Sequence, residues 1–142
     1  MVVLPESATD ADIIAAVDSW VRLLESEDYV AASEGVDSPP SGVWTPEFIR
    51  SCIKDHWDDA PKDHRVTFAG LTRQFTFDDG RIFVKTQRKD VARWSEPNDG
   101  GELHEIWYDL NVDGVVSDLT ATFRLARAPQ GLLLRLYDIC VR

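Results

Sequence analysis

The feature that most constrains the fold is a change in the spacing of apolar residues near His64. Before this point apolar side chains recur at intervals of three and four residues, which is typical of amphipathic helices. After it they alternate with polar side chains, which is typical of strands with one buried face. Helices followed by a run of strands predict an α+β fold, with the helices packed on one face of a curved antiparallel sheet.

The first part of the chain predicts a long helix and one further turn. The helix begins after Thr9, a good N-cap whose capping-box partner is Asp12, and continues to about Glu27. Its apolar stripe consists of Ile13, Val17, Trp20, Val21 and Leu24. Residues 28–32 predict one more helical turn, and residues 35–42, which contain two adjacent prolines, predict a loop.

A second helix is predicted from Thr45 onwards. Thr45 is a suitable N-cap, Pro46 is tolerated in the first turn, and the charge of Glu47 interacts favourably with the helix dipole. We expect its buried stripe to consist of Ile49, Cys52, Ile53, His56 and Trp57.

Short turns divide the rest of the chain into about five or six strands. The sequence Asp78-Asp79-Gly80 between two apolar runs predicts a hairpin. Residues 88–101 are polar and end in two glycines, so we expect a long loop there. The last three strands are expected at residues 103–112, 115–126 and 132–141.

The length of 142 residues fits a single domain. We expect residues 1–8 to be a loose tail and residues 9–142 to form the domain. No signal peptide or membrane-spanning segment is evident, so we expect a cytoplasmic protein that does not bind membranes. The two cysteines, Cys52 and Cys140, lack metal-ligand spacing, and their redox state stays open. With no phosphate-binding or dinucleotide-binding motif, no cofactor or metal is expected.

The net charge of −10 is unevenly distributed along the chain. Residues 1–63 contain 14 acidic and 4 basic residues, whereas residues 64–142 contain 11 of each. This excess disfavours nucleic-acid binding and anionic membranes. A group of bases within about twenty residues is interpreted as a solvated hairpin face that balances the acidic first half, rather than as an anion site. Its members are Arg73, Arg81, Lys85, Arg88, Lys89 and Arg93.

The order of these elements resembles a known superfamily. A helix with Trp20 on its core face, then Asp28-Tyr29-Val30-Ala31-Ala32, then a helix from Thr45-Pro46-Glu47 and a closing meander is similar to nuclear transport factor two-like proteins. Ketosteroid isomerases and polyketide cyclases share this cone, or cystatin-like, fold. The segments Ser117-Asp118-Leu119-Thr120 and Tyr137-Asp138-Ile139-Cys140-Val141 also resemble a bacterial domain family of unknown function.

The resemblance implies a cone-shaped pocket between the helices and the sheet, but it assigns no reaction. No residue of this chain matches the general base or the oxyanion donors of the isomerases. A third helix between the early strands, usual in such folds, is also not expected here.

Three residues are candidates for proton transfer. Strict alternation places Asp138 on one face with Leu134 and Leu136, where a dry setting would raise the pKa of its carboxyl and suit a general acid or base. His104 shares a face with Tyr108 in the same way. The alternative is structural: Asp138 is satisfied by water or an arginine near the strand end, and His104 is partly buried with a backbone partner.

Aromatic residues suggest where a ligand or a protein partner would bind. The candidate ligand-binding residues are Trp57, Trp94, Trp107, Asp109 and Tyr137. Trp94 lies in the expected loop and should be the most exposed tryptophan. The histidines His56 and His64 lie among several aspartates, but their spacing does not favour a metal site.

Three functions remain open at this point. The first is a non-catalytic binding or interaction domain whose pocket takes a small molecule or a protein partner. The second is an enzyme of the isomerase, cyclase or dehydratase kind that uses Asp138 and His104. The third is an acidic, immunity-type inhibitor of a basic toxin. Dimerisation through the open sheet face is compatible with each of them.

Overall fold

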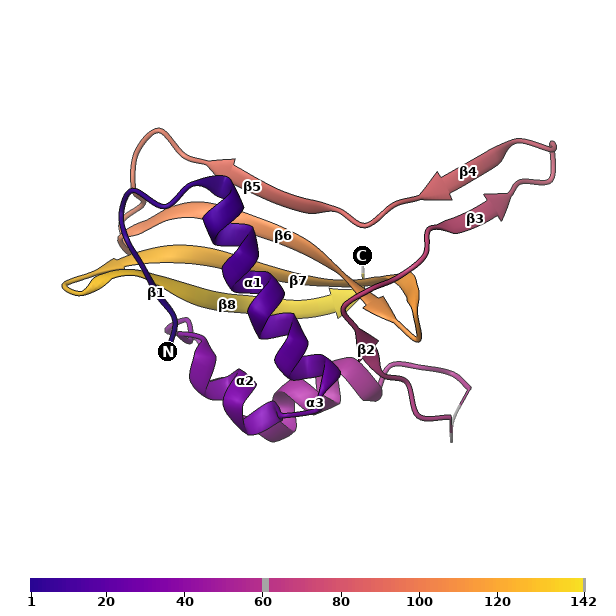
Figure 1. Ribbon diagram of the computed structural model, residues 1–142, viewed down its shortest axis with the longest axis horizontal. Coiled ribbons are helices and arrows are strands. Elements are labelled where there is room, and N and C mark those ends of the chain that lie inside the picture. Colours follow the sequence, from indigo (N-terminus) through magenta and orange to yellow (C-terminus); the bar gives the residue numbers. More distant parts are fainter. Residues whose placement is uncertain (60–61, 142) are drawn as a thin grey trace.

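All the helices of the described chain lie on one face of a curled antiparallel sheet (Figure 1). The computed structural model describes residues 1–59 and 62–141. Three helices cover a six-stranded sheet, and a separate pair of strands projects from it. The predicted α+β class, with N-terminal helices packed on a curved antiparallel sheet, is confirmed.

Each helix begins at a capping side chain. Helix α1 (Asp10–Glu25) carries the predicted capping box, in which Thr9 and Asp12 bond each other's backbone N–H. Helix α2 (Tyr29–Gly35) is longer than the single turn expected and is capped by Asp28. Helix α3 (Pro46–Lys54) is capped by Thr45 as predicted.

The expected stripe of α3 is wrong at its end. The helix stops at Lys54, so His56 is exposed and Trp57 is half-buried beyond the last turn. The Trp57 indole N–H donates to the Ile53 carbonyl at 2.7 Å, a carbonyl that would otherwise accept the next helical hydrogen bond. The Trp57 side chain therefore takes the place of the backbone N–H that would continue the helix, and α3 ends here.

The main sheet has the strand order β1-β8-β7-β6-β2, and β5 also pairs with β6. Three long strands form its centre, as predicted. These strands are β6 (Glu102–Val112), β7 (Val115–Ala128) and β8 (Gly131–Val141). The flanking strands are β1 (Val3–Leu4), β2 (Val66–Thr67) and β5 (Lys89–Arg93).

Two segments that we expected to be irregular are strands. Residues 1–8 are not a loose tail, because β1 pairs with β8 and Ala8 is buried. Residues 88–101 are not wholly a loop, because they contain β5. Ion pairs of Lys89 with Asp18 and of Arg93 with Asp10 hold β5 against α1. The pairing of β1 with β8 joins distant parts of the chain, so local sequence patterns could not reveal it.

The core lies between the helices and the sheet. The Trp20 ring meets the Phe123 ring edge-on at 5.2 Å between centroids, and its indole N–H donates to the Ala32 carbonyl at 3.0 Å. The largest fully buried side chains of this core include Trp20, Tyr108, Phe123, Ile49, Ile53 and Leu134. These side chains occupy the space where the cone-shaped pocket was expected.

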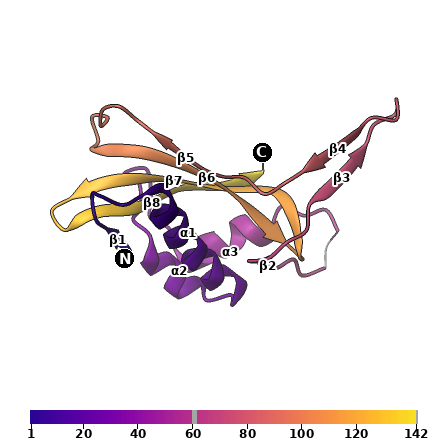
Figure 2. The same ribbon diagram turned by 45° about the horizontal axis from the view of Figure 1, so that its top comes forward.

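The two-stranded element, here called the arm (residues 73–85), consists of β3 (Arg73–Thr76) and β4 (Ile82–Lys85). It is the hairpin predicted around Asp78-Asp79-Gly80. Figures 1 and 2 show it extending past the end of the main sheet and away from the helices. No described helix has the length and apolar character needed to cross a bilayer.

Truncating the central tryptophan tests this packing. Trp20→Ala should lower the free energy of unfolding by about 3–5 kcal/mol, because it leaves a large cavity against Phe123. Urea denaturation measures the change, and Val43→Ala, at a side chain 77% exposed, is the control. A loss below about 1 kcal/mol for Trp20→Ala would show that this contact is not central to the core.

Candidate functional site

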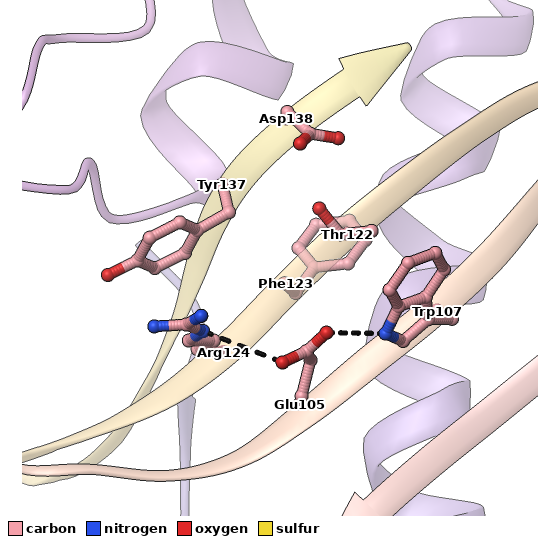
Figure 3. Close-up of a pocket in the computed structure, with 7 residues that line it drawn as sticks. All are labelled: Glu105, Trp107, Thr122, Phe123, Arg124, Tyr137 and Asp138. Carbon is pink, nitrogen blue, oxygen red and sulfur yellow. Dashed lines mark hydrogen bonds and ion pairs between the residues drawn. The ribbon is translucent and has the colours of Figure 1, made fainter. Parts of the chain in front are cut away.

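A shallow hollow of about 180 Å³ lies on the face of the sheet opposite the helices, here called the outer face. Strands β6, β7 and β8 all contribute to it (Figure 3). It is lined by Glu105, Trp107, Thr122, Phe123, Arg124, Tyr137 and Asp138. Three predicted residues, Trp107, Tyr137 and Asp138, are therefore brought together.

A β-bulge explains why Asp138 lies here. Leu136 pairs with Phe123, but the next pair is Asp138 with Thr122, so Tyr137 is an extra residue in β8. One extra residue reverses which face the following side chains occupy. The expectation that Asp138 lies on the leucine face is therefore wrong, and Ile139 takes the buried position instead.

Glu105 connects two walls of the hollow. Its carboxylate accepts from the Trp107 indole N–H and lies 3.8 Å from Arg124 Nε, as Figure 3 shows. The Arg124 guanidinium also stacks on the Tyr137 ring, 4.3 Å from its centroid. Aromatic rings and paired charges thus line the hollow together. Its volume is below the roughly 300–1,000 Å³ of typical small-molecule pockets.

A buried glutamate beside the hollow was missed by the sequence analysis. Glu102 is 3% exposed and accepts hydrogen bonds from Tyr137 at 2.5 Å, Arg124 at 3.0 Å and Arg135 at 3.2 Å. Asn98 donates a fourth bond at 2.8 Å. Alternation puts Glu102 on the same face as His104, but a register shift between them moves it to the outer face.

The protonation state of Glu102 follows from these partners. Burial by itself raises the pKa of Glu102, but the hydrogen bonds from Tyr137, Asn98, Arg124 and Arg135 outweigh burial and lower it to about 2. Conversely, burial and the bond to Glu102 raise the pKa of Tyr137. Tyr137 is therefore a hydrogen-bond donor at neutral pH and not a base.

His104 lies away from the hollow. It shares the helix side of β6 with Ile106 and Tyr108, near the N-terminus of α1. Its Nδ1 accepts from the Trp94 backbone N–H at 3.2 Å. Burial and the nearby charge of Arg93 lower the pKa of His104, so the ring is neutral at pH 7. The structure does not bring His104 and Asp138 together.

Tyr108 is fully buried and donates to Asp18 of α1 at 2.6 Å. Burial and the bond to Asp18 raise its pKa, so the hydroxyl keeps its proton at any physiological pH. Lys89 forms an ion pair with the same carboxylate at 2.9 Å. The geometry of Tyr108 is thus that of a core tyrosine that joins α1 to the sheet.

The remaining predicted ligand residues are dispersed. Trp57 stacks on His64, 4.3 Å between centroids, and Trp94 is half-buried beneath Arg124. Asp109 is 5% exposed and accepts from the Arg88 backbone N–H at 2.9 Å and the Thr120 hydroxyl at 3.0 Å. Trp94 is half-buried, like Trp57 and Trp107, and the Arg124 guanidinium lies over its ring at 5.4 Å from the centroid.

His64, whose ring stacks on Trp57, is paired with two aspartates. His64 lies 2.7 Å from Asp59 and 2.6 Å from Asp113, and these two contacts raise the pKa of its imidazole. Among residues 1–59 and 62–141, no three His, Cys, Asp or Glu side chains are grouped as a metal site would require. Cys52 and Cys140 line one hollow of about 280 Å³, and burial raises the pKa of the Cys52 thiol.

The arm is the second candidate site. Apolar side chains on it and at its root are 38–74% exposed: Leu71, Phe75, Phe77, Ile82, Phe83 and Val84. At the root, Asp118 of β7 binds both Arg73 and Lys85, the latter at 2.9 Å. Asp118 therefore has a structural role at the root of the arm. The ion pairs hold the arm in place but leave its apolar side chains exposed.

The fold and these sites define a class but no family. The chain is an α+β protein whose curled antiparallel sheet and helices are compatible with a cone fold. Comparison with protein-family models, curated proteins and solved structures finds no match to this chain. Membership of the nuclear transport factor two-like superfamily therefore stays a prediction.

The Glu102 cluster predicts how stability depends on pH. A carboxyl with a pKa of about 2 in the fold, against an ordinary value of 4.5, stabilises the fold above pH 4.5, and this contribution is lost as the pH falls towards 2. At pH 7, Glu102→Gln should lower the free energy of unfolding by roughly 3 kcal/mol. Denaturant titrations across this pH range measure the effect.

The difference between wild type and Glu102→Gln should shrink as the pH falls from 4.5 to about 2. Glu34→Gln, at an exposed position of α2, is the control and should change stability by less than about 0.5 kcal/mol. A Glu102→Gln effect that stays constant over the whole range would contradict the assigned pKa.

Proposed function

We propose that this chain is a non-catalytic protein-interaction domain whose contact element is the arm. The observation that carries the proposal is the exposure of apolar side chains along a projecting hairpin, such as Phe77 at 49%, Ile82 at 61% and Phe83 at 52%. A soluble domain rarely exposes a contiguous apolar patch without a partner to cover it. Pairs of strands that pack on nothing are also marginally stable in water.

The charges on and near the arm favour a protein partner over an anionic ligand. Each basic residue of the group between Arg73 and Arg93 forms an ion pair with a carboxylate. The basic residues are Arg73, Arg81, Lys85, Arg88, Lys89 and Arg93. Arg81 pairs with Asp79 at 2.6 Å, and Lys85 pairs with Asp118 at 2.9 Å. A phosphate backbone would have to displace these carboxylates, so nucleic acid is not the proposed partner.

The outer hollow supports catalysis less well than the arm supports binding. Asp138 lines the hollow, whereas His104 lies on the helix side of the sheet. Tyr137 and Glu102 bond each other. Trp107 and Arg124 likewise both contact Glu105, whereas general acid–base catalysis requires a donor and an acceptor aimed at a common point. The hypothesis of an isomerase-like enzyme is therefore less well supported than the proposed interaction domain.

One observation supports the alternative function of an immunity-type inhibitor of a basic toxin, namely the net charge of −10. Part of the acidic excess of the first half is used inside the molecule, however. Among the described residues, cations after His64 take part in six such ion pairs: Glu6–Arg127, Asp10–Arg93, Asp18–Lys89, Glu27–Arg65, Asp37–Arg135 and Asp63–Arg65. An acidic surface is thus a weaker basis for partner choice than the arm.

Site-specific photo-crosslinking tests the proposal. Replacing Phe83 with a photoreactive phenylalanine analogue should give adducts with a partner protein in the native cell, because this ring is exposed on the arm. The matched control is the same replacement at Phe48, which is equally exposed at 52% but lies on α3. Adduct yield, measured on denaturing gels, should be several-fold higher at Phe83.

Equal yields at the two positions, or no adduct at Phe83, would contradict the proposal. Phe83→Ser should abolish adducts from a probe placed at Phe75, its neighbour across the hairpin. The same substitution should leave the free energy of unfolding within about 0.5 kcal/mol of wild type, because the side chain is exposed.

A further inference from the structure

We infer that two copies of this chain pair through the free edges of their β4 strands, antiparallel and about a two-fold axis. The two hairpins then form one four-stranded sheet. This inference rests on the proposed function and names the partner as a second copy of the chain.

The hydrogen-bond pattern of the arm leaves a free backbone edge on β4. The Phe77 N–H donates to the Arg81 carbonyl at 2.8 Å, so hydrogen-bonded pairs alternate from there and include Phe75 with Phe83. Ile82 and Val84 are the intervening residues. Their N–H and C=O groups therefore point away from β3, and β3 is the one described strand with which β4 pairs.

The side chains along this edge favour pairing with another strand. Ile82, Phe83 and Val84 are consecutive, have high strand propensity and are 50–61% exposed. No proline or charge interrupts them, although such residues are the usual protection of an exposed edge. Antiparallel addition would bring apolar side chains of both copies together on each face of the new sheet.

The edges of the main sheet are protected. Strands β1 and β2 have two residues each, and β5 carries charged residues at Lys89, Asp90 and Arg93. The uncovered side of β8 is bridged by Asp37, which bonds the backbone of Leu134 and Leu136. The main sheet's edges are thus blocked, and the free edge of β3 carries the polar residues Gln74 and Thr76. The apolar edge of β4 is therefore the one best suited to strand addition.

Charge complementarity selects a second copy as the partner. The tip of the arm carries Asp78, Asp79 and Arg81, a net charge of −1, while its root has Arg73 and Lys85 around the single Asp118, a net charge of +1. Antiparallel pairing about a two-fold axis places each tip beside the partner's root. The contact is self-complementary, as closed dimers require.

Amide exchange and sedimentation test the inference on the purified full chain. Raising the protein concentration from the micromolar to the millimolar range should convert monomer to dimer. It should also slow amide exchange at Ile82 and Val84, while Phe83, already bonded to β3, changes little. A chain that remains monomeric, or exchange at Ile82 and Val84 that does not depend on concentration, would overturn the inference.

Paired proline substitutions supply a matched control. Val84→Pro removes an N–H that points to the free edge of β4 without breaking a bond to β3, and it should raise the dimer dissociation constant by about tenfold or more. Thr76→Pro makes the same change on the opposite edge of the arm and should leave the constant unchanged. Equal effects of the two variants would also overturn the inference.

Failure of this inference is distinguishable from failure of the proposed function. If the purified chain stays monomeric but Phe83 crosslinks a different protein in cells, the arm binds a foreign partner and only the self-pairing is wrong. If neither dimer nor crosslink forms, both proposals fail. The mass of the crosslinked adduct separates the cases, because two copies give twice the mass of one chain.

Discussion

The structure depends on burying the helices against one face of the sheet. The edge-on contact of Trp20 with Phe123 joins α1 to the middle strand, and Trp44 donates to the Leu136 carbonyl at 2.7 Å to anchor the segment before α3. Both indole donors bond backbone carbonyls, so their burial leaves no unmade hydrogen bond. The consequence is an outer face without a helix over it, where polar side chains must satisfy one another.

That requirement shapes the outer face. Glu102 is almost fully buried and would be costly there without partners, so a hydroxyl, an amide and two guanidinium groups surround it. Arg124 also approaches Tyr137 and Glu105, which leaves a small hollow between groups that contact one another. A network of mutually bonded polar groups therefore occupies this part of the outer face.

Local signals explain what the sequence could predict. Helices α1 and α3 begin at Thr9 and Thr45 because capping is a short-range interaction, and the three long strands follow from alternation and tight turns. The β-bulges depend on how neighbouring strands pair, and the local sequence pattern of one strand does not reveal this pairing. One extra residue at Tyr137 is enough to move Asp138 to the outer face. A register shift next to Glu102 moves this glutamate to the outer face as well, so alternation along the sequence could not identify it as part of the site.

The arm has the local sequence pattern of a hairpin, but the rest of the fold does not bury its apolar side chains. Its alternation and turn form a hairpin, yet the large apolar side chains from Phe75 to Val84 remain 38–61% exposed. The fold protects its main sheet with short or charged edge strands, so an unprotected edge at β4 is not a general property of this protein. Asp118 holds the arm at its root through Arg73 and Lys85, so the hairpin is positioned without being buried, and this supports the proposed pairing with another strand.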